Sequence, residues 1–301
     1  MKPGQLLLVM LAVVLVLGPA WLAFHGRNAR RIEQDLHGPA IAWREGLRSL
    51  LAYVLAFNLT FLIQELALVV PKALTPGLRP TLFHNNHTWE GTHPLAALFQ
   101  GTGALATFTL GLACLWWLRR GGGRSRNLRL WLVWMAYCGT MMALPQVAVG
   151  AVHPGNDVGM AMQWLGWSPM TRAVAGAVAL AAIAPIALAL LPALLSTATD
   201  PRQVATARSR NRFVFVMAVM PAFLAVVPII AFRVPREWIE VCALPLVIAL
   251  VGTAWLQAGA WRACPGSGDV LAAGRLSLLC IAALALLVLF QGVLRPGIAF
   301  Y

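Results

Sequence analysis

The sequence predicts an all-α protein, a polytopic bundle of about eight transmembrane helices with both termini on the outer side of the membrane. Composition favours this class because 60% of the 301 residues are hydrophobic and only 11% are charged, whereas soluble domains carry about 25% charged residues. Length favours it too, since several apolar runs reach the roughly 20 residues that a helix needs to cross a bilayer. The basic residues then indicate how these helices alternate across the membrane.

Eight apolar runs are long enough to span. They cover approximately residues 5–24, 49–70, 94–118, 130–151, 171–196, 213–233, 238–258 and 275–294. The first run also has the features of a cleaved signal peptide, since Lys2 precedes it and Gly18, Pro19 and Ala20 lie near its end. No gap between runs is long and polar enough for a soluble domain, so we expect residues 1–301 to form a single membrane domain.

Basic residues favour one orientation of this bundle. Most of the 23 Lys and Arg residues lie in every second connection, and such residues concentrate on the cytoplasmic side of membranes. The basic connections contain Arg27, Arg30, Arg31, Arg44, Arg48, Arg119, Arg120, Arg124, Arg126, Arg129, Arg202, Arg208, Arg210, Arg212, Arg262 and Arg275. Both termini and the other connections are therefore predicted to lie outside. Charges spread in this way also argue against nucleic-acid binding, which needs them on one soluble face.

The chain divides into three regions. Residues 25–48 are too polar to span and are expected to be an interfacial connector, either a short helix on the inner surface or a solvated loop. Residues 50–195 carry the polar side chains of interest, and residues 196–301 are predicted to be mostly scaffold helices. Small residues at every fourth position let helices pack closely, which places the third and fifth spans at the centre through Gly103, Thr107 and Gly111, and through Ala173, Ala177 and Ala181.

Glu65 is the candidate catalytic residue. It lies roughly 8 Å below the outer end of the second run at 1.5 Å per residue. An acid at this depth costs a few kcal/mol unless it is paired, protonated or beside a wet cavity, so it marks a functional site. A neutral Glu65 that is hydrogen-bonded to another helix is the structural alternative. Supporting roles are predicted for the neighbouring amides Gln64, Asn58 and Gln100.

Histidines gather in the predicted outer connections. His84, His87 and His93 follow the second span, and His153 and Asp157 follow the fourth. Imidazole and carboxylate are ligands of first-row transition metals. We therefore predict one bound transition metal ion, Zn²⁺ first, held by His84, His87, His93 and Asp157 with His153 in support. Hydrogen-bonded structural histidines and a proton relay are the alternatives.

The order of these features resembles the site-two-protease family of intramembrane zinc metallopeptidases over residues 50–195. The resemblance rests on Gln64-Glu65-Leu66-Ala67-Leu68, on the small-residue helix from Gln100 to Gly111, and on Pro154-Gly155-Asn156-Asp157-Val158-Gly159. It implies that Glu65 matches the general base of the family's HExxH motif and that Asp157 matches its late metal ligand. Both motif histidines are missing, because Gln64 and Leu68 occupy their positions and leucine cannot bind zinc. The resemblance therefore implies either a pseudoenzyme or a site whose ligands come from the outer histidines.

Three classes of function are compatible with these features. The first is an enzyme or pseudoenzyme with an outward-facing polar site, the second a transporter subunit in which Glu65 binds a proton or a cation, and the third a structural or assembly subunit. We place the first ahead because the sequence shows none of the repeats typical of transporters. The expected partners are the lipid bilayer and other membrane proteins that contact small-residue helix faces. The composition, rich in Ala, Leu and Arg, favours a bacterial inner membrane.

Overall fold

The computed structural model describes residues 3–29, 39–235, 238–264, 271–272 and 274–301. Within these ranges, eight helical segments are long and apolar enough to cross a membrane. They are Val9–Asn28, Trp43–Ala73, Ala96–Arg119, Arg126–Val152, Pro169–Leu195, Ala207–Arg233, Val241–Gly259 and Leu276–Leu294. The protein is therefore an all-helical, multi-pass membrane protein, which confirms the fold class predicted from the sequence.

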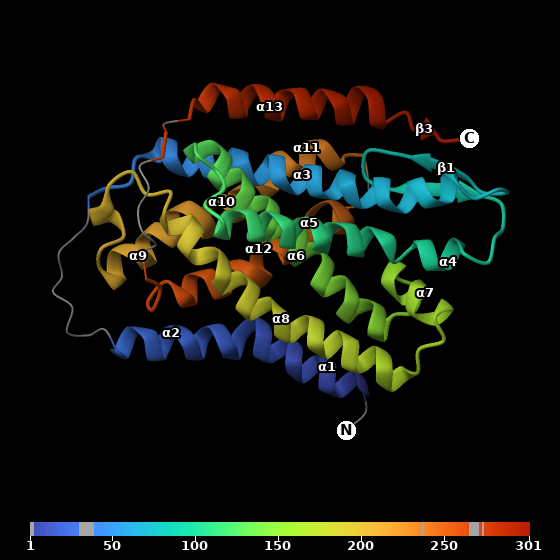
Figure 1. Ribbon diagram of the computed structural model, residues 1–301, viewed down its shortest axis with the longest axis horizontal. Helices are drawn as coiled ribbons and strands as arrows, with labels where there is room; N and C mark the ends of the chain where they lie inside the picture. Colours follow the sequence, from blue (N-terminus) through green and yellow to red (C-terminus); the bar gives the residue numbers. More distant parts are fainter. Residues whose placement is uncertain (1–2, 30–38, 236–237, 265–270, 273) are drawn as a thin grey trace.

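The long helices lie side by side along the longest axis of the molecule (Figure 1). Some spans consist of several elements, because π-helical turns interrupt them near Val13, Phe215 and Leu289. In chain order the elements are α1 (Pro3–Ala12), η1 (Val13–Leu17), α2 (Gly18–Ala29), α3 (Trp43–Ala73), β1 (Arg79–Leu82), β2 (His87–Glu90), α4 (Ala96–Phe99), α5 (Thr102–Arg119), α6 (Arg126–Val152), α7 (Asp157–Trp164), α8 (Pro169–Leu195), η2 (Pro201–Gln203), α9 (Ala207–Val214), η3 (Phe215–Val219), α10 (Met220–Leu224), α11 (Val226–Arg233), α12 (Trp238–Gly259), α13 (Leu276–Val288), η4 (Leu289–Leu294) and β3 (Ile298–Ala299).

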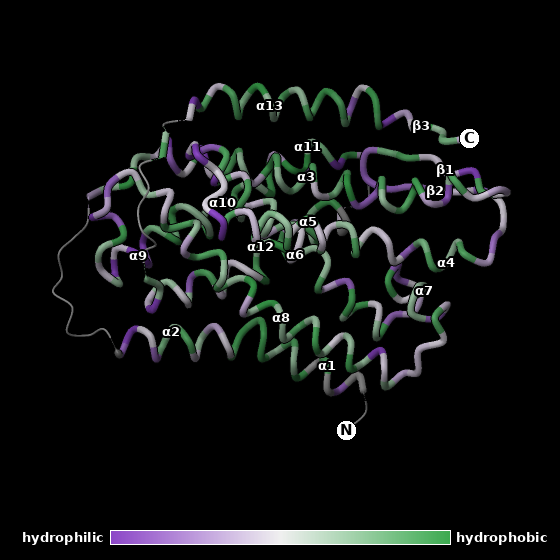
Figure 2. The backbone as a smooth tube through the Cα atoms, in the orientation of Figure 1, coloured by the Kyte–Doolittle hydropathy of each residue, from purple (hydrophilic) through white to green (hydrophobic). Residues whose placement is uncertain are grey.

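The connections gather at the two ends of the bundle because successive spans run in opposite directions (Figure 1). We call the end with both termini, β1, α4 and α7 the site end. The opposite end, where residues 120–125, 196–206, 260–264 and 274–275 lie, is the arginine end. Hydrophobic residues follow the lengths of the helices between these ends, as a membrane-spanning bundle requires (Figure 2).

Helices occupy both ends of the connector predicted over residues 25–48. Helix α2 continues to Ala29 and α3 already begins at Trp43, so the second span starts six residues before the predicted 49. Charged side chains are accommodated in this first turn because Arg48 Nη1 donates to both carboxylate oxygens of Glu45 at 2.9 Å. Much of the surface helix predicted within residues 25–48 falls on residues 30–38, which lie outside the described residues.

A small antiparallel sheet at the site end was not predicted. Strand β1 pairs with β2 in a hairpin and with β3 from the C-terminus, giving the order β2-β1-β3. Strands of two to four residues are too short to show an alternating hydrophobic pattern. The hairpin matters for function because it carries His87 back over the end of α3.

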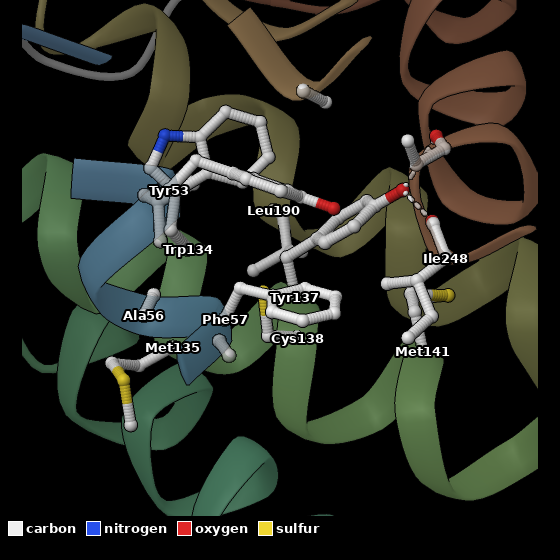
Figure 3. Close-up of a cluster of buried hydrophobic side chains, with 14 of the residues drawn as sticks. Tyr53, Ala56, Phe57, Trp134, Met135, Tyr137, Cys138, Met141, Leu190 and Ile248 are labelled. Carbon is white, nitrogen blue, oxygen red and sulfur yellow. Dashed lines mark hydrogen bonds between the residues drawn. The ribbon is translucent and has the colours of Figure 1, made fainter. Parts of the chain in front are cut away.

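The second and fourth spans form the centre of the bundle. Their most apolar windows are 67% and 72% buried, against 39% and 44% for the third and fifth spans, so the prediction that the small-residue spans are central is wrong. Large aromatic side chains from α3 and α6 fill the centre, and Tyr53 meets Trp134 edge to face at 4.8 Å (Figure 3). The Tyr137 hydroxyl donates to the carbonyl of Ile248 at 2.7 Å, which ties α12 to this core (Figure 3).

The small residues of α5 do allow close helix packing, and their partner is α6. A Cβ atom added to Gly139 of α6 would lie 2.6 Å from the Thr107 carbonyl oxygen and 2.8 Å from Gly111 Cα. The missing side chains therefore allow α5 to touch α6 backbone to backbone. This contact fixes the span that leads to Gln146 against the span that follows Gln100.

Candidate functional site

The candidate site begins with a buried carboxylate and imidazole pair. Glu65 Oε2 lies 2.9 Å from His87 Nδ1, and 7% and 6% of the two side chains are exposed. Glu65 stands on the penultimate turns of α3, while His87 opens β2 and reaches it because the hairpin folds back along the helix end. The acid predicted from sequence depth is thus paired with one of the predicted histidines.

Lys72 completes this pair on its far side. The residue follows Glu65 by two helical turns, so both side chains lie on one face of α3. Its Nζ atom lies 3.1 Å from His87 Nε2, 2.9 Å from the Leu68 carbonyl oxygen and 3.2 Å from Gln100 Oε1. The side chain is fully buried. A lysine in the apolar part of a membrane protein costs free energy unless it has such hydrogen-bond partners.

The surroundings of Lys72 match the hydrogen-bonding capacity of its side chain. An ammonium group has three N–H donors, and Leu68, Gln100 and His87 offer three acceptors around it. With Nδ1 protonated, His87 satisfies both of its contacts, because Nε2 then accepts from Lys72 and Nδ1 donates to Glu65.

Trp89 shields this network from the solvent side. Its ring stacks on the His87 ring with centroids 5.7 Å apart, and Lys72 Nζ lies 4.7 Å from its centroid. An ammonium over an indole face gains a cation–π interaction, which strengthens when water is excluded. Trp89 thus holds the plane of the His87 ring and also stabilises the ammonium charge of Lys72.

Glu65 also lines a polar cavity of about 370 Å³. Helix α3, the turn between β1 and β2, and helices α6, α7, α11 and α12 enclose it. The lining residues are Phe61, Gln64, Glu65, Asn85, Met142, Gln146, Asn156, Asp157, Arg233 and Leu244. A cavity of this size and polarity lies within the range of small-ligand sites, which span roughly 300–1,000 Å³. The structure thus brings Glu65 of α3 and Asp157 of α7, which are 92 positions apart in sequence, to one cavity.

Amides and an arginine hold the cavity walls. Gln146 Nε2 donates to Gln64 Oε1 at 2.9 Å and so joins α6 to α3. Asn85 Nδ2 donates to the Arg233 carbonyl oxygen at 2.7 Å. The Arg233 guanidinium lies 4.4 Å from the Phe61 ring centroid. The walls therefore present both signs of charge and several amides to a ligand.

Asp157 is the first residue of α7 and lines the same cavity as Glu65. Burial raises the pKa of its carboxyl above the usual range, and the nearby Glu65 charge raises it further, whereas His87 and Lys72 oppose the shift. Because the folded protein then holds this proton more tightly than the unfolded chain, the associated stability is present below the ordinary pKa near 3.8 and is lost as pH rises towards the folded pKa.

We therefore expect Asp157→Asn to gain melting temperature relative to wild type as pH rises from about 4. Asp200→Asn is the matched control, because hydrogen bonds from Arg202 lower the pKa of Asp200 and its removal should cost stability over the same rise. Melting curves in detergent between pH 3 and 9 measure both. A pH-independent difference for Asp157→Asn would contradict the burial of this carboxyl.

Several predicted site residues lie elsewhere. His93 Nδ1 accepts a hydrogen bond from the Leu95 backbone N–H at 3.2 Å, in the turn before α4. His153 ends α6 and is exposed. Asn58 is buried in α3, where Nδ2 donates to the Val54 carbonyl oxygen at 2.8 Å. His84 is buried beside Asn85 in the hairpin turn.

The predicted metal ligands do not gather into one coordination sphere. Among the described residues, no three His, Cys, Asp or Glu side chains are grouped closely enough to hold an ion. At the positions of the HExxH histidines, Gln64 bonds to Gln146, and Leu68 packs against Gly103, whose added Cβ would lie 2.9 Å from Leu68 Cγ. The bound ion stays a prediction, which elemental analysis of the purified protein can check.

Sequence reasoning missed four contributors to the site. Lys72 does have a sequence signal, because its spacing of seven from Glu65, itself seven from Asn58, places all three on one helix face. Arg233 lies at the end of the sixth apolar run, where a basic residue usually indicates topology and not a cavity wall. Gln146 and Trp89 carry no sequence signal that separates them from other interfacial residues.

Comparison with known proteins adds no further constraint. No protein-family model, curated protein or solved structure matches the chain. The resemblance to intramembrane metallopeptidases therefore rests on the sequence features alone. The finding that stands is that the chain is a multi-pass membrane protein with a buried acid, imidazole and lysine network beside a polar cavity.

Proposed function

We propose that the protein is an enzyme-like membrane protein that performs acid–base chemistry on a small polar substrate. Glu65 is the group that transfers the proton, and His87 and Lys72 position it and supply charge. One observation carries this proposal: the Glu65 carboxylate lines a polar cavity while its Oε2 atom is hydrogen-bonded into a buried chain that ends at an ammonium. Purely structural ion pairs need no such cavity.

The chain of groups suits proton transfer in either direction. When Glu65 takes a proton from a substrate, the network keeps the positive charge of the Lys72 ammonium, which can stabilise the anion left on the substrate. In the reverse direction, Lys72 gives a proton to His87 Nε2 as His87 Nδ1 gives one to Glu65, which then acts as an acid towards the cavity. Arg233 and Asp157 on other walls can orient a polar group through charge and hydrogen bonding.

Glu65→Gln tests the proposal. The amide keeps the shape of Glu65 but cannot accept a proton, so the rate should fall about 100-fold or more, the usual weight of a general base. Purified protein in nanodiscs is incubated in D₂O with small ketones, esters, amides and amino compounds, and NMR follows deuterium uptake and hydrolysis. Glu45→Gln, on the same helix at the arginine end, should leave the rate unchanged.

Three outcomes of this experiment and a matching proton-transport assay would contradict the proposal. A Glu65→Gln protein that converts the substrate at the wild-type rate would make the pair structural. A wild-type protein that converts nothing, yet moves protons in proteoliposomes in a Glu65-dependent way, would favour the transporter class. Inactivity in both assays would favour a pseudoenzyme or an assembly subunit.

The proposal includes the orientation, with the site end facing outward and the arginine end inward. The positive-inside distribution of arginines supports it. In a variant lacking the native cysteines, Glu90→Cys should react with an impermeant maleimide from outside intact cells, and Arg124→Cys only after lysis. Both positions are exposed, at the site end and the arginine end respectively. The reverse pattern would place the cavity on the cytoplasmic side.

A further inference from the structure

A second, apolar cavity lies far from the Glu65 network, on the flank of the bundle. It has a volume of about 630 Å³ and lies between residues of α13, α3 and α6. The apolar lining includes Leu55, Leu59, Trp131, Leu279, Ala282 and Leu286. Helix α13 lies on the outside of the bundle beside α3 (Figure 1), and only 11% of its span window is buried, less than for the other described spans.

The cavity has a polar mouth at the arginine end. Ser125 and Asn127, at the start of α6, line it there. Asn127 Nδ2 donates to the Arg275 carbonyl oxygen at 2.9 Å, and Arg48 Nη2 donates to the Gly274 carbonyl oxygen at 2.9 Å. These bonds hold Arg275 next to the mouth. Arg124, the neighbour of Ser125, and Arg275 are both exposed.

We propose that this groove binds an anionic phospholipid, with one acyl chain between α13 and α6 and the headgroup phosphate at Arg124 and Arg275. An acyl chain gains little by leaving other lipid for an apolar groove, since the bilayer is equally apolar. Selectivity must therefore come from the headgroup. Two exposed arginines at the groove mouth, in a chain with a net charge of +13, complement an anionic headgroup and not a zwitterionic one.

The size of the effect follows from the two charges. Each basic side chain near the surface of an anionic membrane changes lipid affinity about five-fold. Arg124→Gln with Arg275→Gln should therefore weaken binding of an anionic lipid by more than about five-fold, and by about 25-fold where the two charges act independently. Filling the groove should act independently of charge, so Ala285→Trp, at a lining position, should also expel the lipid.

Native mass spectrometry of the full-length protein tests this proposal. Protein delipidated in detergent is mixed with equal amounts of phosphatidylglycerol and phosphatidylcholine. Wild type should retain one phosphatidylglycerol, and both the double arginine variant and Ala285→Trp should lose it. Matched controls are Arg262→Gln, exposed at the same end away from the groove, and Leu284→Trp, an exposed residue of α13 that does not line it. Both should bind like wild type.

Other outcomes overturn the proposal. Equal retention of phosphatidylcholine would remove the role of the arginines. Unchanged phosphatidylglycerol binding by Ala285→Trp would place the lipid elsewhere on the surface. A dimer mass without lipid, abolished by Ala285→Trp, would assign the groove to a second copy of the chain. Melting curves confirm that each variant is folded, and Arg124→Lys with Arg275→Lys should keep the lipid because the charge is retained.

Discussion

Replacing Lys72 by Met should destabilise the protein by about 3–5 kcal/mol, the cost of removing one partner from a buried charge pair. Methionine fills a similar volume, so the loss reports charge and hydrogen bonds more than packing. Without the ammonium, the Glu65 carboxylate stays buried beside a neutral imidazole, and the acceptors on Leu68 and Gln100 lose their donor. Denaturant unfolding in detergent measures the free energy.

A double-mutant cycle separates charge from packing in this result. Because Glu65→Gln removes the uncompensated anion, the variant with both changes should be more stable than Lys72→Met alone. Arg79→Met is the control, since that exposed side chain at the same end makes only a cation–π contact with Tyr301 at 5.9 Å, worth about 0.5–1 kcal/mol. A loss below 1 kcal/mol for Lys72→Met would mean that the network is uncharged.

Glu65 was predictable from sequence, and the reason is energetic. An acid deep in an apolar run is costly unless the fold compensates it, so its position alone indicates a site. The compensation itself was less visible. Lys72 sits near the predicted end of the span, where a lysine usually reaches out to the headgroups. Only the hairpin, which lowers His87 and Trp89 over the end of α3, turns that lysine inward.

The predicted metal site shows that residue spacing alone does not predict which side chains converge. Four histidines share the connections of one end, yet sharing an end does not place side chains on one point. His93 Nδ1 accepts a hydrogen bond from the Leu95 backbone N–H in its own turn, and His153 is exposed. Of the predicted ligands, only His87 contacts Glu65, and Asp157 joins them across the cavity. Side-chain convergence depends on turn geometry that residue spacing does not encode.

The eight spans were predictable because the bilayer sets their length and polarity. Their packing order was not. Small residues correctly indicate close helix contacts, but a close contact need not be central. The most buried helices, α3 and α6, instead carry the aromatic side chains Tyr53, Phe57, Trp134 and Tyr137, which fill the volume where several helices converge. Burial of a span thus follows from the sum of its neighbours.

A backbone-to-backbone contact joins α5 and α6, the two helices that lie next to Gln100 and carry Gln146. Gly111 and Gly139 face each other so closely that an added Cβ on Gly111 would lie 2.8 Å from the Thr140 backbone nitrogen. Backbone atoms cannot rotate away as side chains do, so a larger residue must separate the helices. Gln100 precedes α5 and Gln146 stands on α6, so both arms of the polar site would shift with them.

Replacing Gly139 by Leu should therefore destabilise the protein by about 3 kcal/mol, the upper part of the range for overpacked cores. It should also weaken proton transfer at Glu65, because Gln100 and Gln146 move relative to α3. Gly292→Leu is the matched control, since an added Cβ there meets no atom within 4 Å. Unfolding free energies and the NMR assay of both variants provide the measurement. Equal stability of the two would show that α5 and α6 do not touch through their glycines, and a stable Gly139→Leu protein with normal activity would disconnect this interface from the site.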